Sequence, residues 1–218
     1  MIEEIKAAAR RRLAADGADL SLRRVASDLD IVPSALYRYF SSRDQLLTAL
    51  IIEAYQALAE AARQAAAQAQ SARPRDRFLA VSHAVRQWAL DHPAEYNLLY
   101  GGPVPGYAAP QDTVAPAATV ILLLVEIAAE GAARGQTLPP SAPMPEPVRK
   151  DLQELIDQHP VDISEELLNR VFAGWTHLFG LISFEVFGRL ETIIHARRDY
   201  FDHQMGLMAD LCGLPHRP

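Results

Sequence analysis

The pattern of hydrophobic and polar positions is helical along almost the whole chain. In residues 2–16, Ile5, Ala8, Ala9 and Leu13 follow the three- and four-residue spacing of a buried helical stripe. Alternating apolar and polar runs, which a half-buried strand requires, are scarce. The sequence therefore predicts an all-α protein.

Two short helices joined by a tight turn follow the first predicted helix. Ser21 is a favourable N-cap for the second, and Pro33 suits the first position of the third, which is predicted to cover residues 33–40. Only the residues "DIV" separate them. Three helices in this order predict a helix-turn-helix of the homeodomain-like type. Ser42 is a suitable N-cap for a fourth helix.

Beyond residue 48 the pattern stays helical. Further helices are predicted at about 75–91, from 93 onward, and at about 113–134, 147–158, 164–189 and 191–212. We therefore predict a helix-turn-helix domain in residues 1–48 and a larger helical domain in residues 49–218, to which the resemblance described below assigns effector binding and dimerisation.

The net charge of −6 argues against a nucleic-acid partner only if the charge is spread evenly. Residues 1–48 carry eight Lys or Arg and seven Asp or Glu, so the acidic excess lies in the rest of the chain. Arg residues also cluster in this first segment. The distribution is compatible with DNA binding.

Cysteine content and hydropathy predict a cytoplasmic protein with no membrane contact. The chain has one cysteine, Cys212, which excludes an internal disulfide framework and fits a reducing compartment. The start "MIEEIKAAARRR" lacks the apolar region of a signal peptide. Glu126 and Glu130 interrupt the most apolar window, "ATVILLLVEIAA", and we expect it to fall short of a membrane span.

Motifs of catalysis are missing from the sequence. It contains no G-x-S-x-G, no H-E-x-x-H and no glycine-rich phosphate loop, and Cys212 has no evident base beside it. His195, Asp199 and His203 stand four residues apart, a spacing that can hold a metal on one helical face, but no Cys or Glu joins them nearby. We predict no enzyme activity, no cofactor and no metal, with a metal-dependent enzyme at this face as the remote alternative.

The third predicted helix has an outer face suited to DNA. Ser34 and Ala35 leave its beginning open to base edges, and Tyr37, Arg38 and Tyr39 follow with hydroxyl and guanidinium donors. Such groups bind phosphate oxygens, and Arg also forks onto guanine. The alternative is that Tyr37 packs against the first helix and Arg38 is merely solvated.

The stretch "LRRVASDLDIVPSALYRYFSSRDQLL" resembles the DNA-binding segment of tetracycline-repressor-like (TetR/AcrR) transcription regulators. The matching positions are Ala26, Ile31, the run Leu36-Tyr37-Arg38-Tyr39-Phe40, Ser41-Ser42, Arg43, Asp44 and Leu46-Leu47. The chain departs from the family pattern with Asp30 for a common Gly, Val32 for a Ser or Thr, and Tyr39 for a His. The resemblance implies a helix-turn-helix regulator of double-stranded operator DNA.

The resemblance also implies which residues lie at DNA. We expect Tyr37, Tyr39 and Arg43 to contact phosphate, and Arg23, Ser34 and Arg38 to be candidates for base readout. The full predicted DNA-binding set is Ser21, Arg23, Pro33, Ser34, Ala35, Tyr37, Arg38, Tyr39 and Arg43.

The segments "HPAEYNLLYGGPVPGY" and "GWTHLFGLISFEVFGRLE" resemble a subgroup of TetR-like C-terminal domains found mainly in actinobacterial regulators. The resemblance implies an effector pocket and a homodimer formed by the last two long helices. Candidate pocket residues are Trp88, Tyr96, Tyr100, Tyr107, Phe172, Trp175 and His177. Candidate interface residues are Phe179, Ile182, Val186, Ile194, Phe201, Met205 and Met208. Ordinary core packing is the alternative for both sets.

Together these patterns predict a dimeric, sequence-specific DNA-binding transcriptional regulator. A repressor released by an unknown small apolar effector is the favoured form. The alternative from another class is a helical small-molecule-binding protein whose helix-turn-helix no longer reads DNA. Steeply salt-dependent operator binding would separate the two.

Overall fold

The structure, a computed structural model, describes residues 1–16, 20–135, 138–139, 142–158 and 161–216. These residues form helices and no strand, which confirms the predicted all-α class. They divide into two compact units. The N-terminal unit comprises residues 1–59 and 88–117, and the C-terminal unit comprises residues 60–87 and 118–218. The division at residue 48 stays a prediction.

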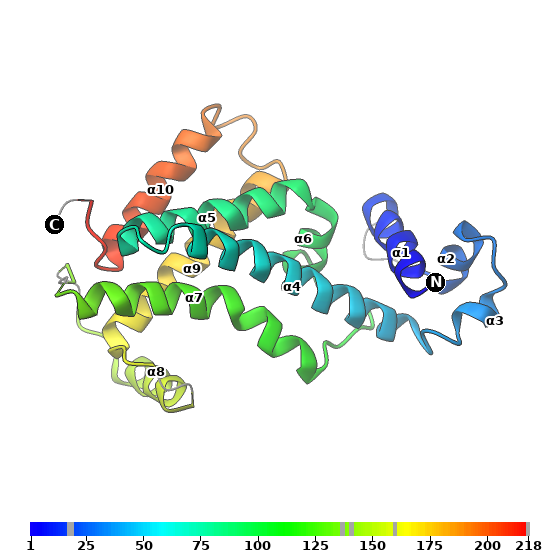
Figure 1. Ribbon diagram of the computed structural model, residues 1–218, viewed down its shortest axis with the longest axis horizontal. Helices are drawn as coiled ribbons and strands as arrows, with labels where there is room; N and C mark the ends of the chain where they lie inside the picture. The colour runs from blue at the N-terminus through cyan, green and yellow to red at the C-terminus, as the bar shows by residue number, and fades with distance from the viewer. Residues whose placement is uncertain (17–19, 136–137, 140–141, 159–160, 217–218) are drawn as a thin grey trace. The chain divides into compact units, whose positions relative to one another are not determined.

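The N-terminal unit begins with the three short helices that the sequence predicts (Figure 1). Segments of three long helices and a short helix complete it. Its elements are α1 (Ile2–Asp16), α2 (Leu22–Asp28), α3 (Pro33–Leu36), the first part of α4 (Arg43–Gln68), the end of α5 (Pro74–Asp91), α6 (Pro93–Tyr100), the 3-10 turn Gln111–Thr113 and the start of α7 (Val114–Ala133).

The core of the N-terminal unit is built on the predicted stripes. Ile5, Ala8, Ala9 and Leu13 of α1 are all buried, as their spacing predicts. The other buried members of this core are Leu20, Leu22, Val25, Ala26, Leu36, Phe40, Leu46, Leu47, Leu50 and Val104. Val104 was not foreseen, because it lies in the loop after α6. The core thus ties residues 101–110 to the helix-turn-helix.

The third helix is shorter than predicted. Its α-helical part ends at Leu36, and a hydrogen-bonded turn carries the chain on to Phe40, whose N–H donates to the Leu36 carbonyl at 3.1 Å. Leu36 and Phe40 are both buried, as expected. Asp30, in the turn before α3, adopts φ +52°, the left-handed conformation for which the family pattern has Gly.

The strained turn at Asp30 yields a stability prediction. Asp30→Ala should lower the free energy of unfolding by about 1 kcal/mol, since Ala has no local polar group to offset the left-handed conformation. Asp30→Gly should be neutral or stabilising, because Gly adopts this conformation freely. Urea denaturation followed by circular dichroism measures both. Equal stability of the two variants would contradict the role assigned to φ.

Ion pairs hold α1 to its neighbours within the N-terminal unit. The buried Lys6 ammonium donates to Glu3 and to Glu53 of α4, and these hydrogen bonds raise its pKa above the usual value. Arg10 also pairs with Glu53. Arg12 pairs with Asp28 of α2, with its Nε 2.6 Å from a carboxylate oxygen. Arg10 and Arg12 therefore join helices within the N-terminal unit.

The C-terminal unit contains the remaining helices, among them α8 (Glu146–Gln158), α9 (Glu165–Val186) and α10 (Arg197–Leu211). Both α8 and α10 pack against α9. The predicted start of the last helix at 191 is wrong, because residues 190–196 form turns after Gly188, which has φ +72°.

One helix in the described part of the chain, Gln111–Ala133, is long and apolar enough to cross a membrane by length and composition, with mean hydropathy 1.8. We had expected Glu126 and Glu130 to make this segment fall short of a membrane span, but the helix still qualifies by length and composition. Core helices of soluble proteins pass the same test. Leu124 and Ile127 of α7 are fully buried within the chain, as in such a core helix.

Candidate nucleic-acid interface

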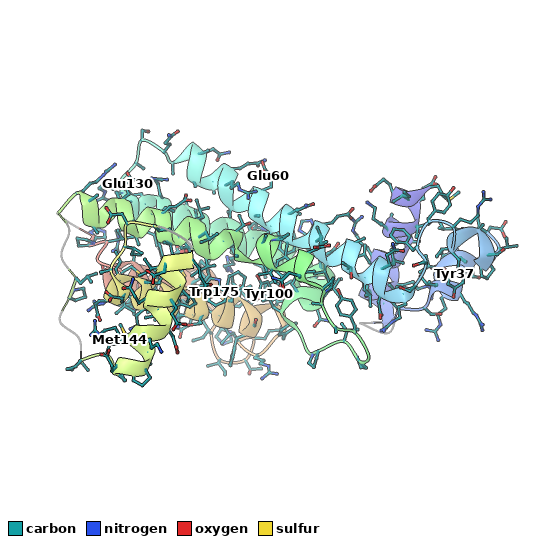
Figure 2. The ribbon with its side chains drawn as sticks, turned by 90° about the horizontal axis from the view of Figure 1, so that it is seen from below. Tyr37, Glu60, Tyr100, Glu130, Met144 and Trp175 are labelled. Carbon is teal, nitrogen blue, oxygen red and sulfur yellow. The ribbon has the colours of Figure 1, made fainter. Side chains whose placement is uncertain are left out.

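The predicted recognition face is exposed. Tyr37 and Tyr39 follow α3 with 48% and 44% of their surface accessible, and Arg38 between them is exposed as well. Figure 2 marks Tyr37 among the short N-terminal helices. Pro33 and Ser34 are exposed, and Ala35 is half-buried. Tyr37 is therefore only partly covered, and its contact with DNA stays a prediction.

A wide, open depression lies beside this face within the N-terminal unit, with a volume of about 930 Å³. It brings together four predicted residues, Ser21, Arg23, Tyr37 and Arg43, from α2, the turn after α3 and the start of α4. Five further contributors were not in the predicted set. These are Leu20, Leu22, Ser41, Ser42 and Pro105. The serines were quoted only as part of the motif, and Pro105 carries no signal of its own.

Arg43 is fixed at the rim of this depression by backbone carbonyls. Its Nε donates to the carbonyl of Leu20 at 2.9 Å, and its Nη1 donates to that of Pro105 at 3.3 Å. The half-buried guanidinium thus links three segments of the N-terminal unit. The predicted contact of Arg43 with phosphate would be made by a guanidinium that these two hydrogen bonds hold in place.

The helix that starts beside the depression, α4, has a reciprocal cap. The Gln45 N–H donates to Ser42 Oγ at 3.1 Å, and the Ser41 N–H donates to Gln45 Oε1 at 2.7 Å. Ser21 occupies the predicted N-cap position of α2 with extended backbone angles and no side-chain cap hydrogen bond. Val32, at the N-cap of α3, likewise makes none.

This arrangement is suited to a phosphate backbone. Hydroxyl and guanidinium donors line one side of an open depression, and two exposed tyrosines and an arginine stand next to it. Phosphate contacts position a protein on DNA, and an exposed Arg near a recognition helix can read a base edge.

Comparison with known proteins identifies the fold's family. Residues 5–50 match the family described as "Bacterial regulatory proteins, tetR family", and residues 78–208 match "Tetracyclin repressor-like, C-terminal domain". The chain belongs to the TetR family. It is a DNA-binding transcriptional regulator, which confirms the resemblance seen in the sequence and the expectation that it is not an enzyme.

Relatives and solved structures agree with this assignment. The chain is 39% identical over 182 residues to HTH-type transcriptional regulator Rv1816 of Mycobacterium tuberculosis and to Mb1846 of Mycobacterium bovis, covering 83% of this chain and 78% of each relative. The crystal structure of SCO4313 is similar with a TM-score of 0.77 and 31% identity, over 95% of this chain and 94% of that one. A tetR-family protein from Rhodococcus RHA1 shares the fold, with a TM-score of 0.66, 18% identity and coverage of 97% and 96%.

The predicted effector residues fall into different surroundings. Trp88 and Tyr96 are buried in the N-terminal unit, where the rings of Tyr96 and Tyr100 contact each other at a tilt of 36°, with centroids 5.0 Å apart. Burial raises the pKa of Tyr100. Tyr107 shares a hydrogen bond of 2.9 Å with Thr48. For these residues the contacts are those of core packing, the alternative considered for them.

The other three predicted effector residues lie on α9 in the C-terminal unit, where Figure 2 marks Trp175. The Trp175 ring contacts the rings of Phe172 and Phe179 edge-on, each with centroids 5.9 Å away. His177 Nε2 lies 3.0 Å from Gln204 Oε1. Phe172 lines an apolar pocket of the C-terminal unit.

Most of the predicted interface residues are covered by their own subunit. Ile182, Phe201 and Met205 are fully buried, and Phe179 is nearly so. These four residues therefore have little accessible surface within one subunit, and their part in an interface stays a prediction. Val186, Ile194 and Met208 are half-buried.

The remaining titratable candidates do not form a site. The sequence had suggested that His195, Asp199 and His203 share one helical face. His195 lies before the start of α10, so it does not lie on a helical face with the other two. No group of three His, Cys, Asp or Glu within the described ranges is placed to hold a metal ion. Burial raises the pKa of Cys212 to about 12, so its thiol stays protonated at neutral pH.

Proposed function

We propose that this chain is a homodimeric, cytoplasmic repressor that is released from its operator by a small apolar effector. Each subunit would present α3 and the following turn to a major groove, with half-sites about 34–36 Å apart or a multiple of this. The observation that carries the proposal is the exposed face of Tyr37, Arg38 and Tyr39 beside the depression that Arg23 and Arg43 line.

The dimer is proposed through the exposed face of α9 and α10. Phe184 of α9, Phe187 at its C-cap and Leu207 of α10 are exposed although they are large and apolar. A shallow depression of about 670 Å³ lies on this face, and its lining includes Ala173, Gly180 and Phe184. Exposed apolar patches of this kind mark interfaces. Two such helices from each subunit would form a four-helix bundle.

Release by an effector follows from a shared equilibrium. An effector that binds better to a form with misplaced recognition helices shifts the population away from the DNA-bound form. Because the coupling is reciprocal, operator DNA would weaken effector binding by the same factor.

The proposal predicts the effect of removing the Tyr37 side chain. Tyr37→Ala should lower operator affinity by roughly 10- to 100-fold, the worth of a hydrogen bond to a charged phosphate. Tyr37→Phe, which lacks only the hydroxyl, should show most of the same loss of operator affinity. Fluorescence anisotropy with an operator duplex at constant salt measures both.

The matched comparison uses two exposed arginines. Arg38→Ala should lower the preference for one base pair by about 1–3 kcal/mol, as expected for a base contact. Arg63→Ala, on the exposed side of α4, should leave that preference unchanged. Parental affinity in Tyr37→Ala together with unchanged preference in Arg38→Ala would show that DNA binds elsewhere.

A further inference from the structure

A second cavity of the C-terminal unit lies between α7, α8 and α9, with a volume of about 180 Å³. Ala118, Leu122 and Val125 of α7 form one wall, and Leu155 and Ile156 of α8 another. Phe172 of α9 faces the same space. Val125 is buried and forms the floor of the cavity. Leu122 and Leu155 are 37% and 38% exposed and form its mouth.

Every lining side chain of this cavity is a hydrocarbon. A charged or strongly polar group would lose its hydration on entering and would find no side-chain partner, at a cost of roughly 2–7 kcal/mol for a neutral polar group and more for a charge. The occupant therefore has to be apolar where it fills the cavity, and any polar end has to point out through the mouth.

The volume limits the size of the occupant. An engineered apolar cavity of about 150 Å³ binds benzene or xenon. A cavity of about 180 Å³ accordingly holds one small ring or a short branched chain. A helix from a partner protein inserts several side chains along a groove and needs much more room. A small molecule fits this space, and a docked helix does not.

The helix α8 covers this cavity, and few of its own side chains stabilise it there. Leu152 is its one buried residue among those described, and Leu155 and Ile156 face the cavity. Its ion pairs, Arg149 with Glu146 at 3.7 Å and Lys150 with Glu154 at 3.9 Å, are exposed and contribute little. A ligand under α8 would add apolar contacts where the helix lacks them.

We propose that the cavity between α7, α8 and α9 is a binding site for a small, uncharged hydrocarbon or for the hydrocarbon end of a larger molecule. The interpretation of this cavity as the effector site rests on the proposed function. Of the residues that we expected to line an effector pocket, Phe172 lines this cavity.

Toluene is a suitable probe, and benzoate is its charged counterpart of similar size. Isothermal titration of the full chain should detect toluene binding, with benzoate bound at least about 10-fold more weakly because its charge would be desolvated. Ala118→Leu should fill the cavity and weaken toluene binding at least about 10-fold. Leu155→Asp, at the exposed mouth, should weaken it as well without disturbing the core.

The control is Ala132→Leu, which adds the same side chain to an exposed position of α7 away from the cavity. It should bind toluene like the parent. Absence of toluene binding to the parent, equal binding of benzoate, or parental toluene affinity in both Ala118→Leu and Leu155→Asp would each overturn the inference.

Operator anisotropy with and without toluene separates this inference from the proposed function. Toluene binding that the cavity variants weaken supports the site, and a simultaneous loss of operator affinity supports its role as the effector site. Binding that leaves operator affinity unchanged keeps the site and contradicts that role. Intact operator binding with no toluene binding overturns the site alone.

Discussion

Replacing Arg86 by Met is expected to lower the free energy of unfolding by about 3–5 kcal/mol, because it leaves the Glu185 carboxylate buried without its partner. The Arg86 Nε and Nη2 donate to the two carboxylate oxygens at 2.7 and 2.5 Å. The two side chains are only 12% and 7% exposed. The guanidinium also lies over the Phe201 ring, 5.2 Å from its centroid. The pair therefore joins α5, α9 and α10 inside the C-terminal unit.

The double variant Arg86→Met, Glu185→Leu shows whether Arg86→Met destabilises the chain through an unpaired buried charge or through lost packing. It should recover most of the stability, since a buried ion pair replaced by apolar groups of similar size is often close to neutral. Arg149→Met, which breaks an exposed pair, should change stability by less than about 0.5 kcal/mol. Denaturant unfolding at one fixed protein concentration measures all three. A double variant as unstable as Arg86→Met would contradict the charge argument.

Gly180→Trp is expected to convert the proposed dimer to a monomer and to lower operator affinity by at least about 100-fold, since one subunit would reach only one half-site. Gly180 lies in the middle of α9 and is exposed. A Cβ added there would meet no atom of its own chain within 4 Å. Gly costs a helix about 0.5–1 kcal/mol relative to Ala, and nothing in the described subunit requires it. Close approach of a second subunit in the proposed dimer would supply the reason.

Sedimentation velocity and operator anisotropy together test this prediction. Ala67→Trp, at an exposed position of α4, is the matched control and should remain dimeric with parental affinity. Gly180→Ala distinguishes the effect of helix propensity from the effect of contact with a second subunit. Ala should stabilise α9 within one subunit, whereas its Cβ should crowd the proposed interface. A dimeric Gly180→Trp protein with parental operator affinity would show that the face of α9 is not the interface.

The helix-turn-helix could be predicted closely because its signals are local. Ile5, Ala8, Ala9 and Leu13 are buried as their spacing implies, and Asp30 adopts the left-handed turn. Each of these features depends on neighbours a few residues away in the chain.

Features made by distant segments could not be predicted in this way. Val104 and Pro105 reach the helix-turn-helix from a loop rich in Pro and Gly, where there is no periodicity to read. The cavity under α8 is formed by segments whose sequence shows only that each is apolar. Which aromatic residues line a cavity and which fill a core depends on these long-range contacts.

The interface residues could not be selected from periodicity for a related reason. The most apolar stripe of α9, which includes Phe179 and Ile182, is buried against the chain's own core. The exposed stripe mixes small residues, such as Ala173 and Gly180, with Phe184. Periodicity marks the apolar stripe of a helix, but it does not show whether the chain's own core or a second subunit covers that stripe.

The most direct test of the central claim is a fluorescence-anisotropy titration of the protein against its own upstream intergenic DNA at two salt concentrations, with an unrelated duplex as the control. We predict tight binding that prefers the upstream DNA and weakens steeply as salt rises, because cationic side chains release counterions from the phosphates. Equal and weak binding to both duplexes would contradict the account of a sequence-specific repressor acting through the Tyr37 face.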